Sequence, residues 1–153
     1  MLVHAEAPLF EETQMAPRLT RLTNSDPAFY ATLGPFLARR EVHKALGGVP
    51  WDEDTKTWFV LADHEGVVAF GAVTQGARRT LLESLYIARP DAAPDAATRL
   101  ITAAVEAFGH DRDLHTKIRN EHVPAYQAVG FHPVKPETNF TALVRPASIR
   151  KNP

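Results

Sequence analysis

The residues of this sequence best placed to do chemistry lie near its C-terminal end, around a tyrosine. Tyr126 falls in a short segment where Pro124 suits the first turn of a helix, because proline lacks only an N–H that would be unpaired there. Gly130 suits the position just past the end of that helix, where the backbone favours positive φ. The flanking segments 114–119 and 131–135 have the pattern of strands. The sequence therefore predicts a phenol on a short helix beside a strand end, where it could donate a proton or simply pack its ring on a sheet.

Carboxylates and histidines supply further candidates for proton transfer. Glu83 lies in a predicted strand at 80–88, where it could act as a base or be an exposed residue of a sheet. His115 and His122 flank the tyrosine segment and titrate in the useful range of pH. The 7 histidines have no metal-like spacing, so we expect no metal site.

Hydrophobic patterning gives the order of the elements that must position these residues. A strand at 18–23 precedes two helices, the first capped by Ser25 or Asp26 and separated from the second at Gly34–Pro35. Gly71 indicates a bulge or a close backbone approach within a strand. The remaining predicted elements are the end of the second helix at 46, three meandering strands at 58–62, 67–74 and 80–88, a long helix ending at 108, a parallel strand at 114–119, the short helix, and two strands at 131–135 and 138–144.

Composition bounds the class of protein. A chain of 153 residues with 44% hydrophobic and 23% charged residues suits one globular domain. We expect it at 17–146, between tails at 1–16 and 147–153. The net charge of −1 does not indicate a nucleic-acid or membrane partner, and the absence of cysteine excludes disulfides and thiolate chemistry. No apolar run is long enough to span a bilayer and the N-terminus lacks a secretory pattern, so we expect a cytoplasmic protein.

The order of elements, with a C-terminal motif, resembles the GCN5-related N-acetyltransferase (GNAT) superfamily. The motif residues are Asn120, Ala125, Tyr126, Gly130 and Phe131, with the Asn-to-Tyr spacing about one residue shorter than is usual in the family. The resemblance implies an α/β (α+β) fold with a mixed, mostly antiparallel sheet of six to seven strands and helices on both faces. It also implies an N-acyltransferase, in which Tyr126 protonates the departing thiolate of coenzyme A and Glu83 acts as the base, directly or through water.

The same resemblance places acetyl-CoA, or another acyl-CoA, on the strand before the long helix and on the N-terminus of that helix. The two parallel strands should separate there, leaving backbone for the amide arm of the cofactor, while helix N–H groups hold its pyrophosphate. The loop departs from the family pattern because it has no glycine, contains Pro94, and carries Asp91 and Asp95, the second of which could simply cap the helix. The residues assigned to the cofactor are Leu85, Tyr86, Ile87, Arg89, Ala96, Ala97, Thr98, Arg99 and Asn120.

The acceptor is expected to be an amine of a small molecule or a protein, bound by the first two helices and the loop after them. The residues assigned to it are His43, Trp51, Asp52 and Glu53. The acids of this loop, with Asp54, could receive a cationic amine beside the tryptophan or could form a solvated turn.

Two other functions remain open. The unusual loop is also compatible with a GNAT-fold enzyme that modifies DNA bases, similar to the phage Mom proteins, which would bring a nucleic-acid partner. A GNAT-like binding module without catalysis is the third reading. A homodimer is possible, and no membrane partner is expected.

Overall fold

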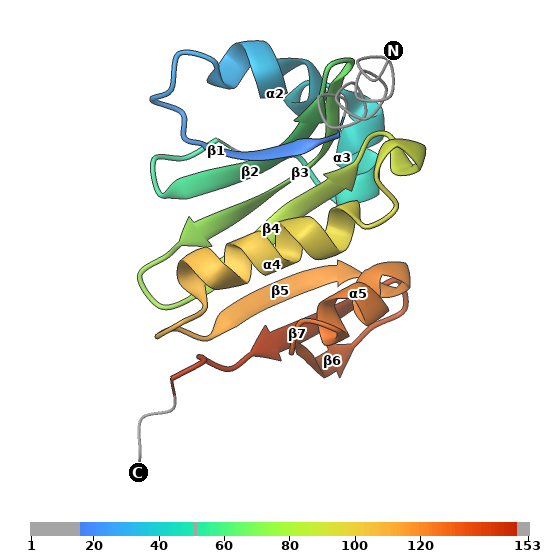
Figure 1. Cartoon of the computed structure of the whole chain (residues 1–153). Helices are drawn as coiled ribbons and strands as arrows, with labels where there is room; N and C mark the ends of the chain where they lie inside the picture. Colours follow the sequence, from blue (N-terminus) through green and yellow to red (C-terminus); the bar gives the residue numbers. More distant parts are fainter. Residues whose placement is uncertain (1–15, 51, 150–153) are drawn as a thin grey trace, which may run out of the picture.

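A single seven-stranded sheet runs through the protein in the computed structural model, which describes residues 16–50 and 52–149 (Figure 1). The strand order is β1-β2-β3-β4-β5-β7-β6, and only β4 and β5 are parallel neighbours. The strands are β1 (Arg18–Leu22), β2 (Lys56–Asp63), β3 (Gly66–Gln75), β4 (Thr80–Ile87), β5 (Leu114–Arg119), β6 (His132–Pro136) and β7 (Phe140–Arg145). The expected mixed, mostly antiparallel sheet is confirmed. Most of the two predicted tails lies outside the described residues.

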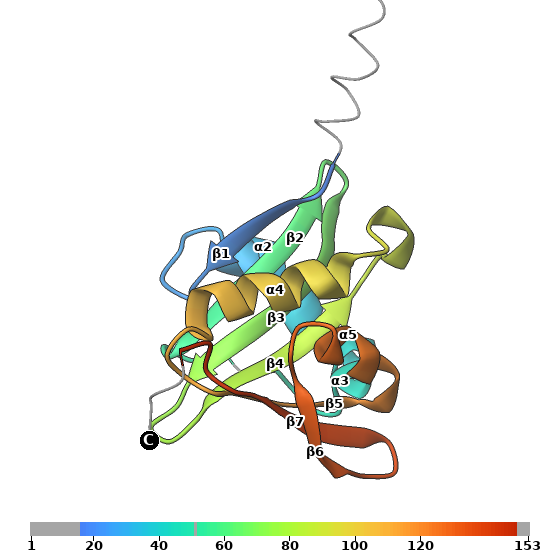
Figure 2. The same ribbon diagram turned by 60° about the horizontal axis from the view of Figure 1, so that its bottom comes forward.

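Helices cover both faces of the sheet, as expected (Figures 1 and 2). One face carries the long helix and the short C-terminal helix, and the other carries the first two helices. The helices are α2 (Phe29–Leu37), α3 (Arg40–Leu46), α4 (Ala96–Phe108) and α5 (Val123–Gln127), with short 3-10 turns at η1 (Pro90–Ala92) and η2 (Asn120–His122). None of the helices in the described ranges is long and apolar enough to cross a bilayer.

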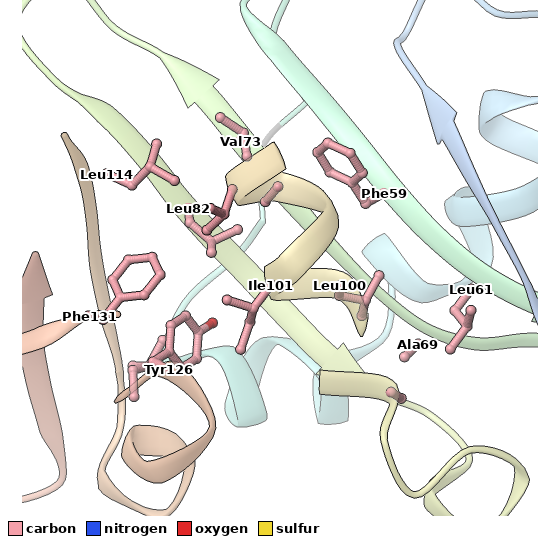
Figure 3. Close-up of a cluster of buried hydrophobic side chains, with 14 of the residues drawn as sticks. Phe59, Leu61, Ala69, Val73, Leu82, Leu100, Ile101, Leu114, Tyr126 and Phe131 are labelled. Atoms are coloured by element: carbon pink, nitrogen blue, oxygen red, sulfur yellow. The ribbon is translucent and has the colours of Figure 1, made fainter. Parts of the chain in front are cut away.

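Alternation along the strands divides the core into two. In β2, Phe59 and Leu61 pack toward α4, while Trp58 and Val60 pack toward α2 and α3. The α4 side is completed by the apolar stripe of that helix, including Leu100, Ile101 and Ala104, against the sheet (Figure 3). The α2 side is completed by Phe29, Leu33, Val42 and Phe70. The two cores fix the sheet from both faces, so its central strands cannot shift without exposing one of them.

The start and the break of the first helices differ from the sequence prediction. The helix α2 continues through Pro35, and the chain leaves helical conformation at Arg39, whose ψ of 133° is extended. The proline removes one backbone donor, but burial of Phe29 and Leu33 before it and packing of Phe36 and Leu37 after it keep the helix in place. The predicted cap is also wrong, because Asp26 accepts the N–H of Thr23 at 2.7 Å and Ala28 occupies the N-cap.

Candidate functional site

The two parallel strands separate soon after they meet. The strands β4 and β5 pair only at Thr80 with Leu114 and at Leu81 with His115. One further link follows, where Thr116 Oγ1 donates a hydrogen bond to the carbonyl oxygen of Leu82 at 2.7 Å. We call the diverging stretch, Ser84–Ile87 of β4 opposite Lys117–Arg119 of β5, the fork. The separation implied by the family resemblance is thus present in the sheet.

A β-bulge in β4 begins the fork. The register with β3 passes from Phe70 opposite Tyr86 to Ala72 opposite Glu83, so Ser84 and Leu85 together face Gly71. Ser84 has a φ of 61°, and it is the one non-glycine residue with positive φ in the described chain. Two residues opposite one bend a strand and increase its twist. The bulge that Gly71 indicated is therefore confirmed, and it turns β4 away from β5.

Tyr126 lies on the α4 face of the sheet, next to the fork. Its ring is fully buried and packs edge-on against Phe131, with ring centroids 5.3 Å apart. In Figure 3 the hydroxyl is directed away from Phe131 and toward Ile101 of α4. That hydroxyl has no hydrogen-bond partner among the described residues. Since an unpaired buried polar group is costly, the geometry marks a proton donor that lacks its acceptor.

Burial also fixes the protonation state of this phenol. It raises the pKa of the Tyr126 hydroxyl above its ordinary value of 10.0; the Thr116 side chain is near enough to offset part of the rise, although its geometry falls short of a hydrogen bond to Tyr126. The hydroxyl therefore keeps its proton throughout the physiological range.

The opposite, α3 face of the fork is hollowed. A small cavity of about 30 Å³ is lined by Ser84 and Leu85 of β4, by Lys117 and Ile118 of β5, and by Leu46 of α3. A larger pocket of about 320 Å³ shares several of these residues and extends to the loop after α3. We call it the loop pocket; its remaining lining includes Gly47, Val49, Pro50, Glu53, Lys56 and Glu83. The fork thus separates a buried phenol on one face from an open pocket on the other.

Glu83 reaches the loop pocket from β4. Its Oε1 lies 2.9 Å from Lys56 Nζ and accepts a hydrogen bond from Thr74 Oγ1, also at 2.9 Å. Sequence reasoning singled out Glu83 but missed Lys56 and Thr74. A signal for Lys56 was present, because it alternates in phase with the buried Trp58 and so occupies an inward position of β2.

Solved structures of proteins that are named as acetyltransferases superpose on this chain, although neither a protein-family model nor a curated protein matches the sequence. ElaA from Escherichia coli superposes with a TM-score of 0.68 at 15% identity, over 84% of this chain and 99% of that one. AAC(6')-Ib in complex with paromomycin and acetyl-CoA superposes with a TM-score of 0.58 at 15% identity, over 86% and 93% of the two chains. A GNAT-family protein from Bacteroides thetaiotaomicron gives 0.55 at 12%, over 84% and 86%. The chain has the GNAT fold.

The loop that binds phosphate in the GNAT resemblance has an unusual charge arrangement here. Arg89 turns back to the β2–β3 hairpin, where it contacts Asp63 and lies 3.1 Å from Glu65. This contact lowers the pKa of Asp63 and raises that of Arg89. Arg99 donates to the carbonyl oxygen of Pro17 at 3.2 Å. Both arginines assigned to the cofactor are thus held by protein groups.

The first turn of α4 nevertheless leaves backbone donors open. Asp95 occupies the N-cap position but its side chain makes no capping hydrogen bond, so the predicted cap is wrong. The N–H of Ala96 bonds to Ala93 and that of Arg99 bonds to Asp95. Within the described chain, the amides of Ala97 and Thr98 have no carbonyl or side-chain acceptor, because the first turn of a helix leaves its early N–H groups unpaired.

Asn120, another residue assigned to the cofactor, is used inside the C-terminal hairpin. Its side-chain nitrogen donates to the carbonyl oxygens of Glu137 and Thr138, and its Oδ1 accepts from Thr141. The preceding Arg119 donates to two carbonyl oxygens at the end of α3, at 2.6 and 2.7 Å. Together these contacts tie the tip of β5 to α3 and to the hairpin, which holds the fork open at its far end.

The residues assigned to the acceptor divide between structural and pocket positions. His43 Nε2 lies 2.6 Å from the carbonyl oxygen of Leu37, and Asp52 accepts the hydroxyl of Tyr30 at 2.6 Å. That contact raises the pKa of Tyr30. Glu53 is different, because it belongs to the lining of the loop pocket. Trp51 lies outside the described residues.

Proposed function

We propose that the protein is an N-acyltransferase that moves an acyl group from a coenzyme A thioester to an amine. The observation that carries this proposal is the fork, with the unpaired phenol of Tyr126 on one side and an open pocket on the other. The GNAT fold supports the class of reaction, and the complex of AAC(6')-Ib with acetyl-CoA supports the class of donor.

The residues present fit an acyl-CoA in two places and depart from the family pattern in one. The edge of β4 at Leu85–Ile87 has no strand beside it to take its hydrogen bonds, which suits the amide arm of the donor. The amides of Ala97 and Thr98 and the dipole of α4 suit a phosphate. The departure lies in Arg89 and Arg99, which are engaged elsewhere, so backbone donors would carry the phosphate contacts.

The reaction joins the amine nitrogen to the acyl carbon and breaks the carbon–sulfur bond. An amine bound as its ammonium ion loses two protons, of which one ends on the sulfur and the other passes to solvent. The thioester supplies the activated acyl carbon and the thiolate leaving group. The residues of this chain orient the two reactants, take a proton from the amine and deliver a proton to the leaving sulfur.

Tyr126 is the proposed proton donor. A general acid must be protonated before the step, and burial ensures this by raising the pKa of the Tyr126 hydroxyl. A sulfur atom in the fork would also give the hydroxyl the hydrogen-bond acceptor that the described residues do not provide. Once it has given up its proton, the phenolate can be reprotonated at the expense of the proton released by the amine.

Glu83 is the proposed proton acceptor. It stands in the loop pocket one residue before the bulge, on the face from which an amine would reach the fork. Its carboxylate can accept an ammonium proton directly or through one water.

The decisive experiment combines binding with turnover. Acetyl-CoA at millimolar concentration should raise the melting temperature of the wild type, since a ligand at 100 times its Kd adds about 2.7 kcal/mol of stability. Tyr126→Phe should keep this shift but lose about 10²–10⁴-fold in kcat for thiol release with an amine acceptor. Tyr30→Phe, at an exposed tyrosine that lines neither the small cavity nor the loop pocket, is the matched control and should behave as the wild type. Absence of a thermal shift with acetyl-CoA and longer acyl-CoA thioesters would overturn the proposal.

A further inference from the structure

We infer that Lys56 and Thr74 are positioning residues that hold Glu83 so that the loop pocket selects a small primary alkylamine bound as its ammonium ion. This inference rests on the proposed function, because it names the acceptor of the same site. It is carried by three contacts and by the chemistry of the pocket wall.

The two residues hold the carboxylate by one oxygen only. Lys56 Nζ and Thr74 Oγ1 both contact Oε1 of Glu83, each at 2.9 Å. No residue in the described ranges bonds to Oε2. The side chain of Lys56 is 2% exposed and that of Glu83 is 36% exposed, so the carboxylate is held from its buried side and open on the other. The open side belongs to the lining of the loop pocket.

The sheet itself places the three residues together. Lys56 of β2 lies directly opposite Thr74 of β3, and Glu83 of β4 pairs with Ala72, two residues before Thr74. Diagonal positions two residues apart share one face of a sheet. Lys56, Thr74 and Glu83 therefore form a row across three central strands, which fixes the free oxygen far better than a loop could.

A purely structural ion pair would not need this asymmetry. A buried lysine is costly unless it is paired, and the contact with Glu83 provides that pairing for Lys56. Apolar residues at these positions would serve stability as well as the ion pair does, so stability alone does not explain the pair. Thr74 adds a second hydrogen bond to the oxygen that is already paired. The arrangement immobilises the carboxylate while leaving its other oxygen available, which is the requirement for orienting an ammonium N–H.

The rest of the pocket defines the acceptor. Its volume of about 320 Å³ is at the small end for ligand pockets, and Leu46, Val49 and Pro50 offer an apolar wall to a carbon chain. Glu53 is a second acidic residue of the lining. The other lysine, Lys117, lies 3.1 Å from Glu137, so its charge is shared with an acid outside the pocket. Lys56 balances the charge of Glu83 and Glu137 balances that of Lys117, so Glu53 leaves the lining with a net negative charge, which favours a cation and opposes an acceptor that carries its own carboxylate.

The substrate class can be tested with a matched pair of amines. With acetyl-CoA as donor, butylamine should be acylated with a kcat/KM at least about tenfold above that of 4-aminobutyrate, which carries an additional terminal carboxylate. A tenfold ratio of kcat/KM corresponds to about 1.4 kcal/mol. Equal use of the two amines, or turnover with neither by a protein that binds acetyl-CoA, would overturn the inference.

The positioning role can be tested at Thr74, where the substitutions nearly preserve shape. Thr74→Val should lower kcat/KM for butylamine about tenfold and leave the KM for acetyl-CoA unchanged, whereas Thr74→Ser should restore the wild-type value because it keeps the hydroxyl donor. Lys56→Met should lower kcat/KM for butylamine by a similar factor if the variant folds. If it does not fold, the comparison of Thr74→Val with Thr74→Ser decides the outcome. Wild-type kinetics in Thr74→Val would refute the role.

These outcomes separate the two proposals. The thermal shift with acetyl-CoA is measured without any amine, so its absence rejects the proposed function. A normal shift together with failure of the amine pair or of the Thr74 pair rejects only the inference about the acceptor.

Discussion

The two edges of β4, an interior strand of the sheet, are paired very differently. On one edge, β4 pairs with β3 along nearly its whole length, from Thr80 opposite Gln75 to Ile87 opposite Ala69. On the other edge, it pairs with β5 at two positions only and then diverges. The same strand is thus a closed element of the core on one side and an open backbone on the other.

This contrast shows how the fold separates stability from function. The closed edge belongs to an antiparallel block, β1 to β4, which contributes three large, fully buried aromatic side chains, Trp58, Phe59 and Phe70. The open edge carries few interactions of its own, and the Tyr126 hydroxyl beside it has no hydrogen-bond partner among the described residues; Trp58 Nε1, in the closed block, is unpaired as well. Such unpaired groups cost free energy in a protein that only folds, and they are explained when a ligand supplies the missing contacts.

The largest expected effect is a difference in the free energy of unfolding between a substitution where β4 and β5 pair and a substitution where they have separated. Leu114 is fully buried where the strands still pair, so Leu114→Ala should lower the free energy of unfolding by about 2–5 kcal/mol. Leu85 is only partly buried in the fork, and Leu85→Ala should cost roughly 1 kcal/mol. Urea denaturation of both variants measures the difference. Equal losses would show that the fork is packed as tightly as the junction, and the contrast between the two ends would be wrong.

A smaller effect concerns the phenol and has the opposite sign at neutral pH. Tyr126→Phe removes a buried hydroxyl that lacks a partner, so the variant should be as stable as the wild type or about 1 kcal/mol more stable. Urea denaturation at pH 7 measures this change. A loss of more than 1 kcal/mol would mean that the hydroxyl is well bonded in the free protein.

The same variant should change the pH dependence of stability. Because burial raises the pKa of Tyr126, its contribution is complete below the ordinary value of 10.0 and is lost as pH rises, since only the unfolded chain then releases the proton. The wild type should therefore lose about 1 kcal/mol more than Tyr126→Phe between pH 10 and pH 11. Parallel curves for the two proteins would contradict the burial of this hydroxyl.

The sequence allowed the order of elements to be predicted, because each element has its own apolar period. Alternation marked the strands at 18–23 and 114–119, residue types that suit a sheet marked β2, and the stripe of α4 marked the long helix that covers the sheet. Gly71 correctly indicated a bulge, since a bulge places two residues opposite one and glycine is frequent there. The break predicted at Gly34–Pro35 was wrong because packing of neighbouring helical residues outweighed a local preference.

Side-chain partners were much harder to predict than elements. Arg89 was assigned to the cofactor, but it binds acids 24 and 26 residues earlier in the chain, which no local pattern connects. The row formed by Lys56, Thr74 and Glu83 likewise depends on the register of three strands. Register follows from turns and packing together, so a single strand pattern cannot give it.

The central claim is that the open edge of β4 is the place where the acyl donor binds. Amide hydrogen exchange with and without acetyl-CoA tests it residue by residue, because a donor paired to the strand protects the amides it bonds. We predict new protection within Leu85–Ile87 and at Ala97 and Thr98, with no change on the edge paired to β3. Protection confined to another part of the molecule, with Leu85–Ile87 exchanging as in the free protein, would contradict the account.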